Sequence, residues 1–203
     1  MHEQCLSSER AEALREAVKK TYRAVAVQPA GRFPYPIGRD GATALGYEAA
    51  WLDAVPPEVV EAFVGVGNPF QVARPRPGEA VLDVGCGAGL DVFLAALLAG
   101  ATGRAAGLDL TAEMLDRPRR SLAARRFGNV EFTVGSAEAI PYADASFDLV
   151  ISNGALNLVP DKDRAFREIR RVLRPGGVFA AADVLVEETV PEALLTAVDA
   201  WST

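Results

Sequence analysis

Histidine and cysteine are nearly absent from this sequence. The only histidine is His2, and the two cysteines are Cys5 and Cys86. A single histidine beside the amino terminus excludes Ser-His-Asp and Cys-His catalysis as well as histidine metal clusters. Two cysteines cannot build a disulfide framework or a thiolate zinc site. We therefore expect a cytoplasmic protein without a metal centre.

Long apolar runs are missing as well, and the densest basic runs, 117–126 and 164–174, are interpreted as solvated helix faces. No stretch of about 18 apolar residues is present, which argues against a membrane span, and we expect no signal peptide because the amino terminus lacks a basic stretch followed by an apolar one. The net charge is −6, and the basic residues form no stripe that could neutralise nucleic-acid phosphates. We expect neither a membrane nor a nucleic acid as a partner.

The chain is predicted to divide near residue 72. Helical periodicity is visible over residues 7–27, and short helices are expected over 42–66, with a break at Pro56-Pro57. A proline- and arginine-rich turn at 74–78 leads into the next unit. We therefore predict an N-terminal helical lid segment, residues 1–72, and a ligand-binding domain, residues 73–203.

Apolar strands and amphipathic helices alternate along the second unit. This alternation predicts parallel βαβ units, and hence an open, doubly wound, Rossmann-like α/β sheet. The expected strands are 80–84, 105–110, 130–134, 147–152 and 178–186; the expected helices are 90–99, 111–126, 161–173 and 192–199.

A glycine-rich loop follows the first of these strands. Asp83-Val84-Gly85-Cys86-Gly87-Ala88-Gly89 joins a strand to a helix, and Asp109 lies twenty residues after Gly89. A carboxylate at that distance can accept both hydroxyls of an adenosine ribose. The glycine spacing is tighter than in dinucleotide sites, and Asp83 would repel a pyrophosphate but attract an ammonium group. The loop therefore favours S-adenosylmethionine over NAD as cofactor.

Five segments, in this order, resemble the class I S-adenosylmethionine-dependent methyltransferases. They cover roughly residues 65–190 and comprise the glycine loop with its strand, Gly107-Leu108-Asp109-Leu110-Thr111, Gly135-Ser136-Ala137-Glu138, Asp148-Leu149-Val150-Ile151-Ser152-Asn153 and Arg174-Pro175-Gly176-Gly177.

The resemblance implies a role for each residue of the cofactor site. Asp83 would lie beside the ammonium group, and Asp109 would bind the ribose. The loop residues Gly85, Cys86, Gly87 and Gly89 would surround the methionine part of the cofactor. Leu110, Met114, Ala137 and Glu138 would contact adenine, and Asn153 with Gly154 would line the methyl-donor mouth. No catalytic side chain is assigned, because the cofactor supplies the electrophile and the protein supplies proximity and alignment.

Finer details are similar to the arsenite methyltransferases. Gly67-Asn68-Pro69 and Asn153-Gly154-Ala155-Leu156-Asn157 carry this likeness. That family binds arsenic through cysteine thiolates, but two of the matching positions here are Val66 and Gly154, and the third would follow Thr203. We therefore expect a small organic acceptor rather than arsenite. Its wall could include Tyr22, Tyr35, Tyr47 and Trp51, which are equally compatible with ordinary core packing.

Two other functions and an incomplete sheet remain as predictions. A cofactor-binding domain without activity and an NAD-dependent oxidoreductase are the alternative functions. Class I methyltransferases usually add two further strands beside the fifth one, and none follows 178–186 before the sequence ends. The domain is therefore predicted to lack its C-terminal strands, and the uncovered sheet edge is a predicted self-association surface.

Overall fold

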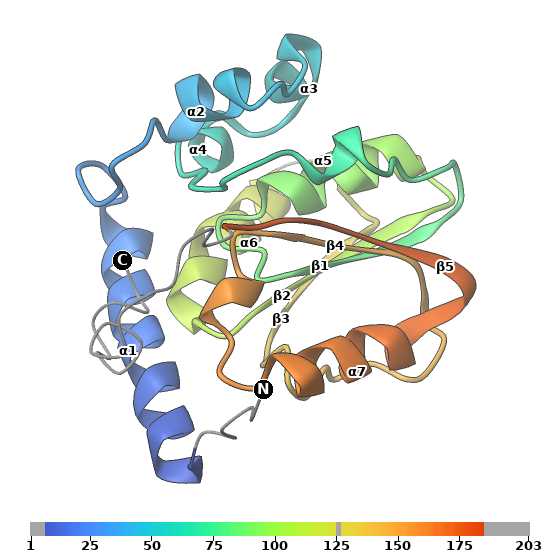
Figure 1. Cartoon of the computed structure of the whole chain (residues 1–203). Helices are drawn as coiled ribbons and strands as arrows, with labels where there is room; N and C mark the ends of the chain where they lie inside the picture. The colour runs from blue at the N-terminus through green and yellow to red at the C-terminus, as the bar shows by residue number, and fades with distance from the viewer. Residues whose placement is uncertain (1–6, 125–126, 185–203) are drawn as a thin grey trace.

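The computed structural model describes residues 7–124 and 127–184, and a five-stranded sheet forms its centre (Figure 1). The strand order is β3-β2-β1-β4-β5, and every pairing is parallel. The chain reverses its winding direction between β1 and β4, which creates a ligand-binding crevice beyond the carboxyl ends of these strands. The doubly wound α/β class is confirmed. The strands are β1 (Ala80–Val84), β2 (Arg104–Asp109), β3 (Val130–Val134), β4 (Phe147–Asn153) and β5 (Leu173–Ala182).

Helices cover both faces of the sheet, and β1 explains why. All five residues of β1 are buried. Val81 belongs to a core cluster with residues of α5, whereas Leu82 belongs to a second cluster with residues of α7. Successive side chains therefore fill opposite faces of the sheet. The helices of this unit are α5 (Leu90–Ala99), η2 (Ala112–Leu115), α6 (Asp116–Ala124), η3 (Leu156–Leu158) and α7 (Lys162–Val172).

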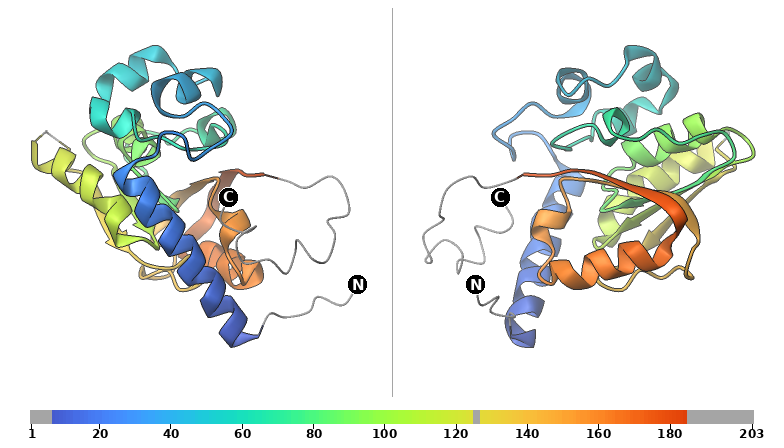
Figure 2. Two further views of the ribbon diagram at one scale, coloured as in Figure 1. Left: turned by 90° about the vertical axis from the view of Figure 1, so that its left-hand side faces the viewer. Right: turned by 45° about the vertical axis from the view of Figure 1, so that its right-hand side comes forward.

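The N-terminal residues pack onto the sheet unit. The helix α1 begins after Ser7, whose side chain accepts a hydrogen bond from the backbone of Arg10, and it runs across the carboxyl-end side of the sheet (Figures 1 and 2). The short helices that follow α1 lie above α5 in Figure 1, and some of their buried residues share a core cluster with α5. The elements are α1 (Ser8–Val27), α2 (Gly38–Ala44), α3 (Ala49–Ala54), α4 (Pro57–Val60) and η1 (Pro69–Gln71).

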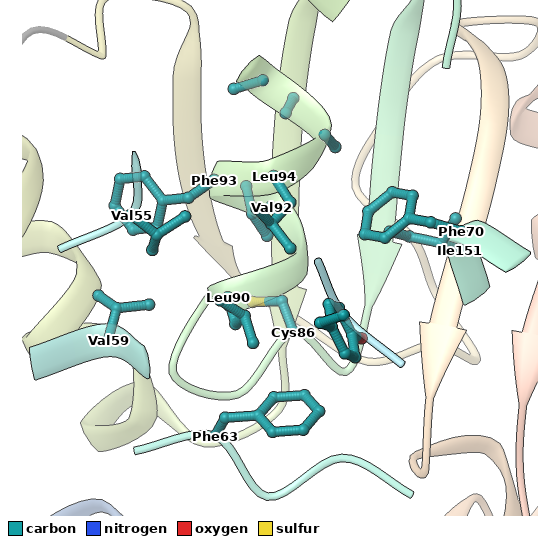
Figure 3. Packing of buried hydrophobic residues seen from close by; sticks show 14 of the residues in the cluster. Val55, Val59, Phe63, Phe70, Cys86, Leu90, Val92, Phe93, Leu94 and Ile151 are labelled. Atoms are coloured by element: carbon teal, nitrogen blue, oxygen red, sulfur yellow. The ribbon is translucent and has the colours of Figure 1, made fainter. Parts of the chain in front are cut away.

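The largest core cluster joins the two units across the predicted boundary at residue 72. Val55 and Val59 lie beside α5, and Phe70 lies beside Ile151 of β4 (Figure 3). Each of these side chains is at most 2 % exposed. The N-terminal segment therefore contributes part of the hydrophobic core that stabilises the sheet.

Several predicted element boundaries differ from the structure, by one residue for β2, β4 and α7 and by up to six for the short helices α2 to α4, which span Gly38 to Val60. The predicted helix 111–126 is a short 3₁₀ helix, η2, followed by α6. The strand β5 begins at Leu173 rather than Val178, because Pro175-Gly176-Gly177 remains within the strand next to an irregularity in the β4 pairing. The strand also ends at Ala182, before the predicted residues 183 and 184; residues 185–186 of the predicted strand and the predicted helix 192–199 lie outside the described residues.

Within residues 7–124 and 127–184, β5 pairs with β4 on one side alone. Self-association through its other edge stays a prediction. None of the helices in these ranges combines the length and the hydropathy that crossing a membrane requires.

Candidate functional site

Two adjoining cavities lie beyond the carboxyl ends of the strands. The larger encloses about 830 Å³, open solvent at its mouth included, and its walls come from α1 and from the residues that follow β1, β2, β3 and β4. The smaller encloses about 340 Å³ around the glycine loop and the first turn of α5. Both are lined by Val64, Gly85, Gly87 and Asn153, so these residues mark their junction.

The glycine loop comes close to the chain after β4. Gly85 has φ +77°, and a Cβ atom at this position would overlap the side chain of Ala155. Only glycine fits there, for reasons of both conformation and space. Glycine at this position therefore lets the loop pack directly against the chain after β4, beside the junction of the two cavities.

Asp109 lies at the end of β2 and lines the larger cavity. Its carboxylate accepts hydrogen bonds from the backbone N–H groups of Gly87 and Thr111, each at 2.8 Å. Burial raises the pKa of Asp109 to about 6, although both hydrogen bonds act in the opposite direction. The second lone pair of each oxygen can accept a hydroxyl, as the predicted ribose role requires.

Asp83 and Asp91 line the smaller cavity and are both buried. Oδ1 of Asp83 has no hydrogen-bond partner within the described residues. Burial is the main cause that raises the pKa of Asp83 well above its usual range. An unpartnered carboxylate oxygen beside a cavity fits a cationic ligand group, and S-adenosylmethionine carries both a sulfonium and an ammonium.

Asn153 lines both cavities, and its side chain is committed to hydrogen bonds within the protein; its place at the methyl-donor mouth stays a prediction. The amide oxygen accepts from the backbone N–H groups of Val66 and Gly67 at 2.9 and 3.1 Å. The amide nitrogen donates to the Gly67 carbonyl at 2.8 Å and to Asp91 at 3.0 Å. Asn153 therefore fixes the segment 65–67 against β4, a structural role that sequence reasoning missed.

Glu138 has a protein partner that the sequence did not indicate. Its carboxylate forms a two-pronged ion pair with Arg15 of α1, at 2.7 and 2.9 Å, and it accepts from the backbone of Asp161 at 3.0 Å. The Glu138 side chain is 5 % exposed. Glu138 thus anchors α1 over the larger cavity, which it also lines, and its contact with adenine stays a prediction. Nothing in the local sequence around Arg15 marks this pairing.

The other predicted cofactor residues fall into three groups. Leu110, Ala137 and Gly154 line the larger cavity, and Cys86 and Gly89 line the smaller one. Met114 is buried beside the loop, where its methyl group would lie 3.4 Å from a Cβ atom on Gly87.

Cys86 is a packing residue. Its sulfur lies among apolar side chains near Phe63 and Leu90 (Figure 3), and burial raises the pKa of the thiol well above its usual range. The thiolate, which is the reactive form, is therefore disfavoured.

The four candidate wall aromatics separate in the structure. Tyr22 of α1 lines the larger cavity. Tyr47 donates to Asp91 at 2.6 Å, and Tyr35 donates to the Val64 carbonyl at 3.2 Å. Trp51 packs against Phe70 and beneath Arg74, away from both cavities.

A family model described as a methyltransferase domain matches residues 75–202. The chain belongs to this methyltransferase family. Its cofactor is S-adenosylmethionine, and the predicted resemblance to the arsenite methyltransferase-like branch is confirmed by the relatives that follow. This family assignment argues against the alternative function of an NAD-dependent oxidoreductase.

Among curated relatives, the methyltransferase is 43 % identical to the arsenite methyltransferase of Halobacterium salinarum over 152 residues, which are 75 % of this chain and 39 % of the relative. It is 43 % identical to the ubiquinone/menaquinone biosynthesis C-methyltransferase UbiE of Hahella chejuensis over 103 residues, 50 % of this chain and 41 % of the relative. The chain thus spans less than half the length of these relatives.

A solved structure supports the same relationship. The crystal structure of CrArsM, an arsenic(III) S-adenosylmethionine methyltransferase from Chlamydomonas reinhardtii, is 39 % identical and superposes with a TM-score of 0.65. The match covers 71 % of this chain and 51 % of that chain.

Proposed function

We propose that this methyltransferase transfers a methyl group from S-adenosylmethionine to a neutral, largely apolar small organic molecule, and that arsenite is not its substrate. The observation that carries the proposal is the contact between Val66 and Gly154. A Cβ atom on Gly154 would lie 3.2 Å from Cγ2 of Val66. The two positions at which the arsenite methyltransferases carry cysteine are therefore neighbours in space, and neither provides a thiolate here.

The rest of the described chain does not replace these thiols. Cys86 is the only cysteine within residues 7–124 and 127–184, and it is buried. The same residues contain no group of three or more histidine, cysteine, aspartate or glutamate side chains placed to hold a metal ion. Thiolate capture of arsenic(III) has no support in this part of the chain.

The walls of the larger cavity favour an uncharged acceptor. Among the described residues, Arg15 is the one cationic side chain that lines this cavity, and its pairing with Glu138 leaves none of them to bind an acidic substrate. Apolar side chains supply much of the remaining wall: Val18, Val64, Leu156, Leu158 and Val159. Similarity to UbiE, whose name describes methylation of carbon in quinone biosynthesis, supports an organic acceptor.

In the proposed site, each chain residue has a positional role. When bound, the cofactor would supply an electrophilic methyl group: the acceptor would bond to the methyl carbon as the C–S bond breaks, S-adenosylhomocysteine would leave, and the acceptor's proton would pass to solvent. Asp109 binds and orients the ribose, and Asp83 pairs with the ammonium group. Asn153 keeps Val66 and Gly154 at the mouth. The helix α1, held by Arg15 and Glu138, excludes water from the larger cavity, which favours transfer to the acceptor over hydrolysis.

We expect no methylated arsenic when the protein is incubated with S-adenosylmethionine, arsenite and glutathione. The physical reason is the absence of two thiolates at positions 66 and 154. The assay measures methylated arsenic and S-adenosylhomocysteine formed, with a panel of neutral phenols, quinols and thiols offered in parallel. Formation of S-adenosylhomocysteine with a member of that panel supports the proposal.

The double variant Val66→Cys/Gly154→Cys is the companion experiment, and Val66→Ser/Gly154→Ser is its matched control. Because residue 154 has φ +69°, any side chain there is strained, and the serine pair carries the same strain without thiols. Arsenite binding by the cysteine pair alone fits the proposal. Methylated arsenic formed by the unaltered chain contradicts it, and cofactor binding without transfer to any acceptor favours a binding domain without activity.

A further inference from the structure

Asp91 is a buried carboxylate that sequence reasoning did not single out. It lies in the first turn of α5, is 4 % exposed and lines the smaller cavity. Oδ1 accepts the Tyr47 hydroxyl at 2.6 Å, and Oδ2 accepts the Asn153 amide at 3.0 Å. Both donors are neutral, so the negative charge of Asp91 is hydrogen-bonded but not neutralised.

A second carboxylate lines the same cavity and has fewer hydrogen-bond partners than Asp91. Asp83 is 2 % exposed, and its Oδ1 has no hydrogen-bond partner within the described residues. No lysine, arginine or histidine is among the residues that line the smaller cavity in the described part of the chain. Two buried carboxylates beside one cavity are costly unless a cation joins them. The smaller cavity is therefore suited to a positively charged group of a ligand.

The two cavities together match the charge distribution of the cofactor. If Asp109 binds the ribose in the larger cavity, the methionine half passes the junction at Gly85 and Gly87 and reaches the smaller one. S-adenosylmethionine carries a sulfonium and an ammonium, whereas the product S-adenosylhomocysteine retains only the ammonium. A carboxylate paired with the ammonium acts on both molecules alike. A second carboxylate can distinguish them.

We propose that Asp91 is a specificity-determining residue, whose buried charge makes this methyltransferase bind the sulfonium cofactor in preference to its neutral thioether product. The proposal rests on the placement of S-adenosylmethionine given under the proposed function. Its consequence is that loss of the positive charge on methyl transfer weakens binding and promotes release of the product.

Asp91→Asn is the direct test, because it removes the charge and keeps the shape. Titration calorimetry measures the dissociation constants of S-adenosylmethionine and S-adenosylhomocysteine for each variant. We expect the preference for S-adenosylmethionine to fall about tenfold in Asp91→Asn, since a unit charge in a partly screened site contributes about that much. Tyr47→Phe is the matched control: it removes the 2.6 Å hydrogen bond, keeps the charge, and should weaken both ligands alike.

The pH dependence supplies a second readout on the unaltered protein. Burial raises the pKa of Asp91 to about 6, against the effect of its hydrogen bonds to Tyr47 and Asn153. The carboxylate is charged above that pH and neutral below it, so the preference for S-adenosylmethionine should decline as the pH falls through about 6. The other titratable groups around the cavity are Asp83 from β1, Cys86 from the loop, Asp109 from β2 and Tyr47, with Arg119 of α6 close enough to influence Cys86.

Asp91→Asn retains all those groups, and the charge of Asp91 is one cause of the raised pKa of Asp83, so the difference between the two pH profiles reports Asp91 together with its effect on Asp83. If Asp91→Asn and the unaltered protein prefer S-adenosylmethionine over S-adenosylhomocysteine to the same extent, the proposal for Asp91 is overturned. The proposed function still stands in that case, provided that the unaltered protein binds both ligands. Failure of the unaltered protein to bind either ligand refutes the proposed function itself. If Asp91→Asn does not fold, the unaltered protein decides alone, and a constant preference between about pH 5 and about pH 8 overturns the proposal.

Discussion

Replacing Asp109 by alanine should weaken the binding of S-adenosylhomocysteine at least tenfold. The substitution removes two charge-assisted hydrogen bonds to the ribose, each of which contributes about 1.5 to 3 kcal/mol. Binding should also weaken as the pH falls through about 6, because burial raises the pKa of Asp109 to about 6 and only the ionised form accepts both hydroxyls. Calorimetry measures both effects.

The same variant should melt close to the unaltered protein in the absence of ligand. Alanine leaves the N–H groups of Gly87 and Thr111 without their 2.8 Å partners, which is destabilising. The substitution also removes a carboxylate whose raised pKa shows that the folded state disfavours its charge. Removing this charge is stabilising, and it offsets part of the stability lost with the two hydrogen bonds. Asp163→Ala, an exposed carboxylate of α7, is the control. Unchanged affinity in Asp109→Ala would remove the ribose assignment.

Phe70→Ala should lower the free energy of unfolding by about 3 to 5 kcal/mol, the usual cost of truncating a fully buried phenylalanine. Phe70 is 1 % exposed, and its ring meets those of Tyr47 and Trp51 at 6.5 and 6.0 Å between centroids. Because Phe70 also shares a core cluster with residues of α5 and β4, we expect a single cooperative unfolding transition whose midpoint shifts to a lower urea concentration. Urea unfolding followed by fluorescence and circular dichroism measures this.

Phe166→Ala is the matched control for Phe70→Ala. Phe166 is 46 % exposed on α7 and contacts Phe179 at 6.0 Å between ring centroids, so its truncation should cost much less. Two separate transitions in Phe70→Ala, with the sheet unaffected, would show that the segment before residue 72 folds independently of the sheet.

The sequence predicted the sheet closely where strong local signals bound each strand. The strand β1 lies between the turn at Gly78 and the glycine loop, and its predicted and observed limits agree. The strand β5 was predicted too short, because Pro175 and the glycines after it are typical of a turn. Leu173 and Val178, on either side of them, pair with β4, so the strand continues through this irregularity; such tertiary context is not visible in a local pattern.

The candidate site was predictable only in part, for the same reason. The glycine loop and Asp109 form a spaced motif that can be recognised along the chain. The pairing of Arg15 with Glu138 joins residues 123 positions apart, and the contacts of Asp91 with Tyr47 and Asn153 bring together three separate segments. None of these residues is distinctive by itself. Only the folded chain shows that the Asn153 and Glu138 side chains hold the walls of the cavities.

Titration of the unaltered chain with S-adenosylhomocysteine and with NAD tests the central claim most directly. The proposed cofactor site lies at the carboxyl ends of β1 and β2, where Asp83 and Asp91 are suited to a cation and unfavourable to a pyrophosphate. We expect saturable one-to-one binding of S-adenosylhomocysteine and no measurable binding of NAD. Absence of S-adenosylhomocysteine binding, or NAD binding of equal strength, would contradict it.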